Sequence, residues 1–418
     1  MYREGYALAF SGGVASVLGL AYWIVAARSY EPRVVGLNSA MISSMTFLTG
    51  VSQLNLASAL IRFVPTAGAA TQRLVSVAYL LSLFTAAAAS LLFLAGVGIW
   101  TPTLAFLRDS AGFVLAFTLA TMACTAFSLQ HSVLTGLRQA LWVPIENGLF
   151  SLVKLGLLLI FAALVPLWAI FASWTAALAL AIAPTVALIF GRLIPQHVRG
   201  VTEGTVPPKW TQITSYAAGD YVGGLCWLAS ITLIPIFVLR EAGPAANAYF
   251  SLSWALVLPL YVVTISMGAS LVVSAVHEAG KLETISYSML RQTAFLVVPL
   301  ALLLVVAAPY VLLIFGKDYS DHGASLLRLL ALATIPGMVN LLYVNVARVR
   351  RRMSIVMMVM ATQSALVLGL TFVCFRLYGL AGVGLAWVVS QFVVAAVLAA
   401  RAVRGVWSRR PYSRANDS

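Results

Sequence analysis

A few residues of this 418-residue chain have side chains that could do chemistry, but they form no recognisable catalytic or metal-binding motif. The four histidines share no metal-ligand spacing, and the three cysteines form no CxxC pair. No glycine-rich phosphate loop precedes a Lys-Ser or Lys-Thr pair. These features argue against an enzyme, a metal centre, a cofactor and an ATP-driven pump.

The remaining candidates are charged and polar residues within long apolar stretches, where burial in a membrane is costly and indicates a function. Four of them fall on one narrow face of a helix predicted over residues 35–62: Ser44, Asn55, Ser58 and Arg62. Such a polar face, ending in a cation at the cytoplasmic side, should face water or a partner helix. The alternative is that Arg62 extends to the lipid headgroups and the hydroxyl groups bond their own backbone.

Two further charges share a helix predicted over 142–164. Glu146 and Lys154 are eight residues apart, which is too far for a direct salt bridge within one helix. We therefore expect their partners on other helices or in a water-filled cavity. Lys154 is a candidate to contact substrate, and Glu146 is a candidate for ion coupling or for balancing a basic neighbour.

Two more candidates lie in the second half of the chain. Asp220 is about ten residues into a helix predicted over 211–239, beside glycines that would let another helix approach. It could bind a proton or sodium ion, or it could pair with a basic residue. Arg291 enters a helix predicted over 284–315 near its cytoplasmic end, where it could line a substrate cavity or anchor the helix at the interface.

Membrane-spanning helices must position these residues, because 61% of the chain is apolar and only 9% is charged. A net charge of +14 then reflects loops between spans rather than a nucleic-acid-binding surface. A span needs about 20 apolar residues. Cutting the sequence at charges, prolines and glycines predicts twelve spans: 5–27, 35–62, 74–100, 111–137, 142–164, 167–191, 211–239, 245–276, 284–315, 322–347, 353–375 and 379–401. The sequence therefore predicts an all-α polytopic membrane protein.

The distribution of basic residues predicts the orientation. With the N-terminus inside, eighteen of the 26 lysines and arginines fall on the cytoplasmic side, so the positive-inside rule places both termini in the cytoplasm. The longest polar connection separates two sets of six spans with the same orientation, as in parallel repeats. The predicted domains are an N-terminal bundle over 1–192, a cytoplasmic linker over 193–210, a C-terminal bundle over 211–404 and a basic tail over 405–418.

Several segments resemble the polysaccharide transporter family of the multidrug/oligosaccharidyl-lipid/polysaccharide (MOP) exporter superfamily, the O-antigen-type lipid-linked oligosaccharide flippases. The resemblance runs through Ala27–Gly36, Gly50–Pro65, Leu134–Arg138, Val153–Leu155, Tyr249–Leu252, Phe315–Tyr319, Leu326–Ala331 and Tyr378–Gly382. It implies two six-helix bundles around a central V-shaped cavity that opens alternately to either side of the membrane.

The resemblance implies a flippase that moves an undecaprenyl-diphosphate-type oligosaccharide to the outer leaflet of the cell membrane for surface polysaccharide synthesis. Its expected partners are the lipid-linked substrate, membrane lipids and other polysaccharide-assembly membrane proteins. Cations such as Arg62, Lys154 and Arg291 favour this anionic substrate over the alternative, an ion-coupled multidrug/cation antiporter of the same superfamily. A membrane-embedded glycan polymerase or ligase ranks third, because the outward connections are short.

Overall fold

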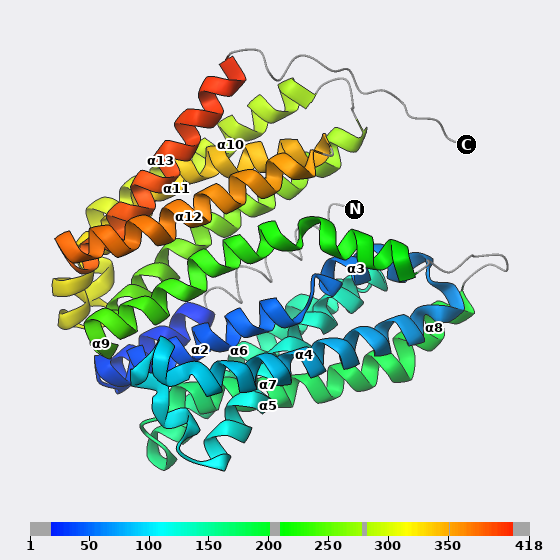
Figure 1. Ribbon diagram of the computed structural model, residues 1–418, viewed down its shortest axis with the longest axis horizontal. Coiled ribbons are helices and arrows are strands. Elements are labelled where there is room, and N and C mark those ends of the chain that lie inside the picture. The colour runs from blue at the N-terminus through cyan, green and yellow to red at the C-terminus, as the bar shows by residue number, and fades with distance from the viewer. Residues whose placement is uncertain (1–17, 201–209, 278–281, 351, 404–418) are drawn as a thin grey trace. The chain divides into compact units, whose positions relative to one another are not determined.

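The computed structural model describes residues 18–200, 210–277, 282–350 and 352–403, and the side chains of 215–220, 269–277, 402 and 403 are outside this description. Helices and their connections make up the described chain, with no β-strand among these residues (Figure 1). The prediction of an all-α polytopic membrane protein is therefore confirmed. Predicted parts that lie outside the described residues are the start of the first span, half of the 193–210 linker (residues 201–209) and the C-terminal tail.

The chain forms two compact units, Met1–Ala248 and Tyr249–Ser418. The first contains a helix over residues 18–29 and the start of a long helix that continues into the second unit. Its other helices are α2 (Pro32–Ser52), α3 (Leu56–Phe63), α4 (Thr71–Trp100), α5 (Ala111–Gly136), α6 (Trp142–Leu164), α7 (Ala169–Leu188) and α8 (Ile194–Arg199). Short helical turns are η1 (Val64–Thr66), η2 (Gly68–Ala70), η3 (Pro102–Arg108) and the π-helical η4 (Ile189–Leu193).

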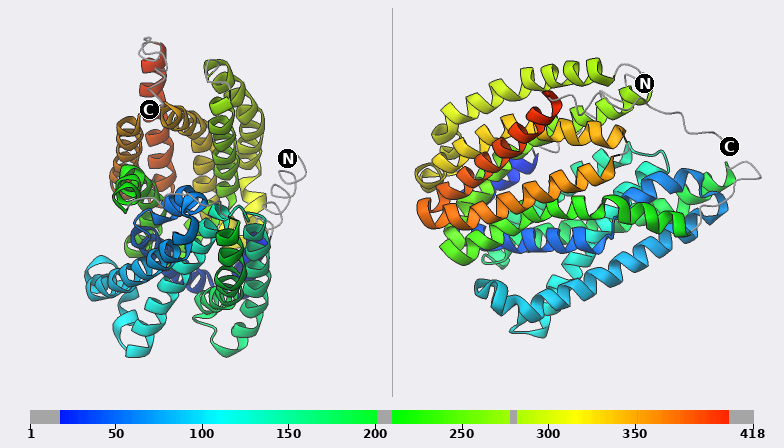
Figure 2. Two further views of the ribbon diagram at one scale, coloured as in Figure 1. Left: turned by 90° about the vertical axis from the view of Figure 1, so that its right-hand side faces the viewer. Right: turned by 45° about the horizontal axis from the view of Figure 1, so that its top comes forward.

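The long helix α9 (Trp210–His277) belongs to both units and is kinked at Gly243, whose φ of 82° interrupts the helical backbone. The second unit continues with α10 (Leu282–Leu313), α11 (Lys317–Val349), α12 (Met353–Tyr378) and α13 (Leu380–Val403). Within this unit α11 packs against α10 and α13, and α13 packs against α12 (Figure 2). The boundary between the units lies within α9, five residues after Gly243. A domain boundary at the 193–210 connection stays a prediction.

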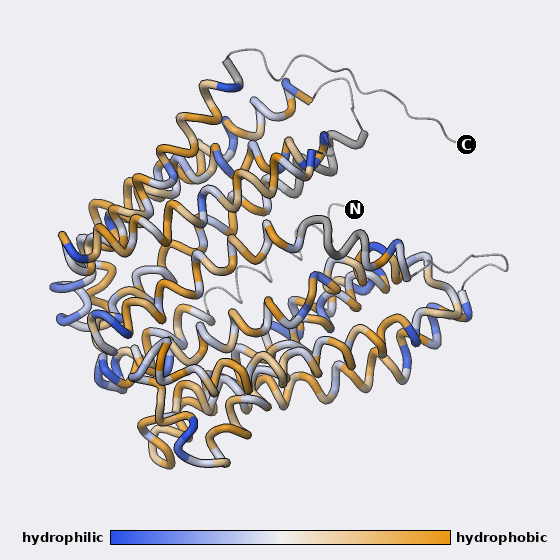
Figure 3. The backbone as a smooth tube through the Cα atoms, in the orientation of Figure 1, coloured by the Kyte–Doolittle hydropathy of each residue, from blue (hydrophilic) through white to orange (hydrophobic). Residues whose placement is uncertain are grey.

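Ten helices of the described chain are long and apolar enough to cross a membrane. One of them, Tyr221–Gly268, has 48 residues and contains the kink, so it has the length of two spans at about 20 residues each. Together with the predicted first span, this agrees with about twelve. Figure 3 shows helices that are hydrophobic along most of their length, with many of the hydrophilic residues near helix ends.

Sequence signals explain where several helices begin and end. Pro32 lies in the first turn of α2, where its missing N–H has no intrahelical partner to lose. Ser110 caps α5 by accepting a 3.2 Å hydrogen bond from the Phe113 amide. Pro195 lies in the first turn of α8, directly after the π-helical turn that accommodates it. The chain therefore stays helical to Arg199, and the predicted helix end at residue 191 is wrong.

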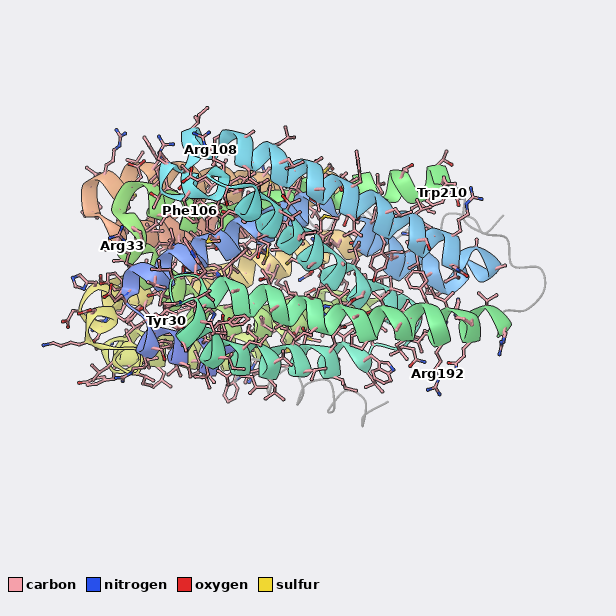
Figure 4. The ribbon with its side chains drawn as sticks, turned by 90° about the horizontal axis from the view of Figure 1, so that it is seen from below. Tyr30, Arg33, Phe106, Arg108, Arg192 and Trp210 are labelled. Atoms are coloured by element: carbon pink, nitrogen blue, oxygen red, sulfur yellow. The ribbon has the colours of Figure 1, made fainter. Side chains whose placement is uncertain are left out.

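The structure separates residues of the first unit toward two opposite ends. Tyr30, Arg33, Phe106 and Arg108 lie at one end, whereas Arg192 and Trp210 lie at the other (Figure 4). This agrees with the alternation of spans that places Arg33 and Arg108 outside and Arg192 in the cytoplasm. Cytoplasmic termini stay a prediction.

Candidate functional site

The helix predicted over 35–62 is broken, and this prediction is wrong. Helix α2 ends at Ser52 and helix α3 begins at Leu56, because Leu54 and Asn55 adopt left-handed backbone conformations with φ of 48° and 57°. Asparagine tolerates this region, but a leucine there is strained. The predicted polar face is consequently not continuous.

Each hydroxyl of the predicted polar face has a local partner. Ser44 is buried and donates to the Ala40 carbonyl, while Ser58 donates to Asn55 Oδ1 at 2.8 Å. Arg62 is exposed near the end of α3, with its guanidinium carbon 5.6 Å from the centre of the Phe63 ring. The structure thus brings Asn55 and Ser58 together and leaves Ser44 on the other side of the break.

Two hydroxyl groups from other helices stabilise the break. Tyr221 of α9 donates to the Val51 carbonyl at 2.6 Å, and Thr85 of α4 donates to the Ser52 carbonyl at 2.7 Å. A broken helix leaves carbonyl groups without their usual intrahelical donors, and in a membrane these must be satisfied by protein or water. The break is therefore a supported feature of the fold.

Replacing Tyr221 with phenylalanine should destabilise the region of the break, because the Val51 carbonyl loses its side-chain donor. The expected cost is about 1–3 kcal/mol. Hydrogen–deuterium exchange of peptides covering residues 50–58 should become faster. The exposed Tyr287, changed to phenylalanine, is the control and should leave this exchange unchanged. Equal exchange in the Tyr221 variant and the wild type would show that the hydroxyl does not support the break.

Glu146 lies in a small polar cluster between α5 and α6. Its carboxylate accepts a hydrogen bond from the amide of Gln130, and its Oε2 is 3.5 Å from Nε2 of His131. Glu146 is 5% exposed and Gln130 is fully buried. Glu146 Oε2, His131 Nε2 and Gln130 Oε1 are buried without a hydrogen bond to any described group. The cluster thus joins a buried acid to a titratable base and keeps unused hydrogen-bonding capacity.

Lys154 lies apart from this acid, inside a cage of aromatic rings. Its ammonium nitrogen is 3.9 Å from the ring centre of Trp174, 4.4 Å from that of Tyr22 and 4.9 Å from that of Phe150. The side chain is 3% exposed. Among the described residues, no carboxylate lies within ion-pair distance of its nitrogen. Cation–π contacts stabilise a desolvated ammonium group by about 2 kcal/mol or more. The three rings therefore stabilise the charge of Lys154 in place of an acidic partner.

The cage is assembled from three helices. Tyr22 belongs to the helix over 18–29, Phe150 to α6 and Trp174 to α7. The Tyr22 hydroxyl donates to the Ile170 carbonyl at 2.9 Å and lies 3.0 Å from the Ser173 hydroxyl. These bonds hold the Tyr22 ring in place over the ammonium group. Polar contacts outside the cage therefore fix one of its three rings, that of Tyr22.

The other predicted site residues lie elsewhere. Arg291 is an exposed residue of α10 in the second unit, beside an open groove lined by Met267, Ser288, Gln292, Phe295 and Leu296. Asp220 lies in α9, and its side chain is outside the described ones. Its role in ion coupling stays a prediction.

Sequence reasoning missed the partners of both buried charges. Gln130 and His131 precede the short connection between α5 and α6 by about as many residues as Glu146 follows it, so the helical hairpin places them side by side. That spacing could have identified them. Tyr22 and Trp174 are about 150 residues apart and carried no such signal.

The comparisons with known proteins support the fold. No protein-family model matches the chain, and no curated protein matches it by sequence. Solved structures do match over nearly the full length. One is an inward-facing multidrug resistance MATE family transporter of the MOP superfamily, with 14% identity, a TM-score of 0.72 and 96% of each chain covered.

Two other matches are similar. An outward-facing multidrug resistance MATE family transporter gives 14% identity and a TM-score of 0.68, covering 97% of this chain and 95% of its own. A MATE transporter of Vibrio cholerae gives 14% identity and a TM-score of 0.65, covering 98% and 97%. The fold is thus that of MATE transporters of the MOP superfamily, the superfamily to which the sequence resemblance points.

Proposed function

We propose that this protein is a secondary transporter that works by alternating access and is driven by an ion gradient. The likeness to MATE transporters over nearly the whole chain supports this proposal, since the matched proteins are named for inward-facing and outward-facing states. The lack of a nucleotide-binding loop in the sequence agrees with a gradient as the energy source. We propose further that the protein lies in the cell membrane with both termini in the cytoplasm.

The observation that carries ion coupling is the Glu146 cluster. A proton on the carboxylate could be donated to His131, and a proton on the imidazole could be donated to the carboxylate. In either case the proton would lie between Oε2 of Glu146 and Nε2 of His131, two buried atoms that have no hydrogen bond to any described group. Ionisable groups buried in spans form the proton relays of transporters. This chemistry favours the ion-coupled multidrug/cation antiporter, and the likeness to multidrug resistance MATE family transporters agrees with it.

The test is transport by the purified full-length protein in lipid vesicles. A fluorescent organic cation should accumulate when a pH gradient or a sodium gradient is imposed, and accumulation should collapse when an ionophore dissipates that gradient. Uptake that ignores every imposed gradient would contradict ion coupling.

A second candidate, lipid-linked oligosaccharide flipping, is favoured by α3. Asn55, Ser58 and Arg62 all lie at or after the break in the span, and discontinuous helices carry the substrate sites of many transporters. Arg62 is an exposed cation able to hold a diphosphate. If flipping is the function, vesicles should translocate a fluorescent diphosphate-linked lipid, Arg62→Ala should abolish this, and Arg62→Lys should retain part of it. Translocation unchanged in Arg62→Ala would leave lipid anchoring as its role.

A further inference from the structure

Lys154 poses a problem of charge balance in the first unit. An ammonium group on a membrane helix is costly to bury, and a counter-ion or several hydrogen bonds normally offset the cost. The nearest acid on the same helix, Glu146, is two turns away and contacts Gln130 and His131 instead. Within the described residues, Lys154 has neither a hydrogen bond nor an ion pair.

The surroundings of Lys154 match those of a ligand-binding site. Three aromatic faces from three helices point at one positive nitrogen at 3.9, 4.4 and 4.9 Å. Aromatic cages of this composition recognise organic ammonium ions, because the negative ring faces attract a cation that is weakly hydrated. The ring faces themselves offer no hydrogen-bond donor to a phosphate or carboxylate. The cage therefore suits a cation better than an anion.

We infer that the cage of Tyr22, Phe150 and Trp174 is a binding site for an organic ammonium ion, and that Lys154 is a tethered competitor for it. The charged side chain fills the cage when no ligand is bound. A ligand enters when Lys154 loses its proton to solvent and its neutral side chain leaves the cage. This rests on the proposed transport function and adds a site and its control, because binding of a cation is then exchanged for release of a proton.

Raising the pH favours neutral lysine, which no longer competes for the ring faces, so an external ammonium ion should bind more tightly. Other titratable groups near the cage are Tyr22 itself and Tyr30, whose hydroxyl donates to the Leu158 carbonyl one turn along α6. Glu146 lies two turns away on α6 in the other direction, next to His131 of α5. Measurements between pH 7.5 and 9.5 avoid the ordinary titration range of histidine.

The experiment is calorimetric titration of the purified full-length protein with tetramethylammonium chloride, with sodium chloride as the reference. At pH 7.5, Lys154→Ala and Lys154→Met should both bind the probe about tenfold more tightly than the wild type. Between pH 7.5 and 9.5 the wild-type affinity should rise, whereas that of both variants should stay constant. Adding Trp174→Leu to Lys154→Ala should remove binding.

Trp23→Phe is the matched control in the Lys154→Ala background. The Trp23 ring packs against Tyr22 and Trp174, but it is not one of the three rings that form the cage. Probe binding should therefore persist in this variant. Equal probe affinity in the wild type and both Lys154 variants would overturn the inference. It would also be overturned if the wild type bound inorganic pyrophosphate and Lys154→Met did not, because Lys154 would then be an anion site. These equilibrium measurements need no gradient, so failure of ion-coupled transport would appear separately, in the vesicle assay.

Discussion

Gradient-driven transport should fall by about tenfold or more when Glu146 is replaced by glutamine, as expected when a relay loses its ionisable group. Glutamine has nearly the same shape and can bond both neighbours, but it cannot accept a proton at physiological pH. Gln130 donates to the present carboxylate and could donate equally to the amide oxygen. The fold should therefore persist, and the measurement is dye accumulation in vesicles alongside thermal stability in detergent.

Glu241→Gln is the matched control for this variant. Glu241 is an exposed acid that lies 3.5 Å from Arg240 of the same helix, and its loss should leave transport unchanged. Asp220→Asn tests the other acid predicted from the sequence for coupling. Full gradient-driven transport by Glu146→Gln would exclude Glu146 as the coupling group. A loss of stability with transport intact would assign the cluster to structure instead.

Gly36→Ala should be among the most destabilising single substitutions in the first unit. A Cβ at this position would overlap the Pro244 carbonyl oxygen of α9 and would lie 2.9 Å from the Ala248 amide nitrogen. The two helices are also joined there by Asn247, whose side-chain amide donates to the Gly36 carbonyl at 2.7 Å and to the Ser39 hydroxyl at 3.1 Å. Forcing the backbones apart strains these bonds and should cost about 1–3 kcal/mol or more.

The measurement is the thermal unfolding midpoint of the purified protein in detergent. Gly148→Ala is the control, because a Cβ there meets nothing within 4 Å. It should raise the midpoint slightly, since alanine stabilises a helix interior by about 0.5–1 kcal/mol over glycine. Equal midpoints for Gly36→Ala and Gly148→Ala would show that α2 and α9 do not pack this closely in solution.

The sequence predicted the helices best where length and hydropathy alone decide them. Helix α6 begins at Trp142 and ends at Leu164, as predicted, because Pro166 and a stretch of some twenty apolar residues define it locally. The break before α3 was missed. A largely apolar stretch is compatible with an unbroken helix even when it contains Asn55, and the hydroxyls of Thr85 and Tyr221 that support the break come from helices far along the chain.

The candidate site divides in the same way. The sequence by itself identified Glu146 and Lys154, because a charge within an apolar stretch is conspicuous and its cost in a membrane is general. The eight-residue spacing also predicted that the two charges do not pair directly, but only the tertiary structure decided which groups each of them contacts. Glu146 meets His131 through a local hairpin, whereas Lys154 meets rings contributed by the helix over 18–29 and by α7. Hydropathy determines which segments enter the membrane. Side-chain packing between helices determines which partner each buried charge contacts, and this packing cannot be inferred from the sequence of any single segment.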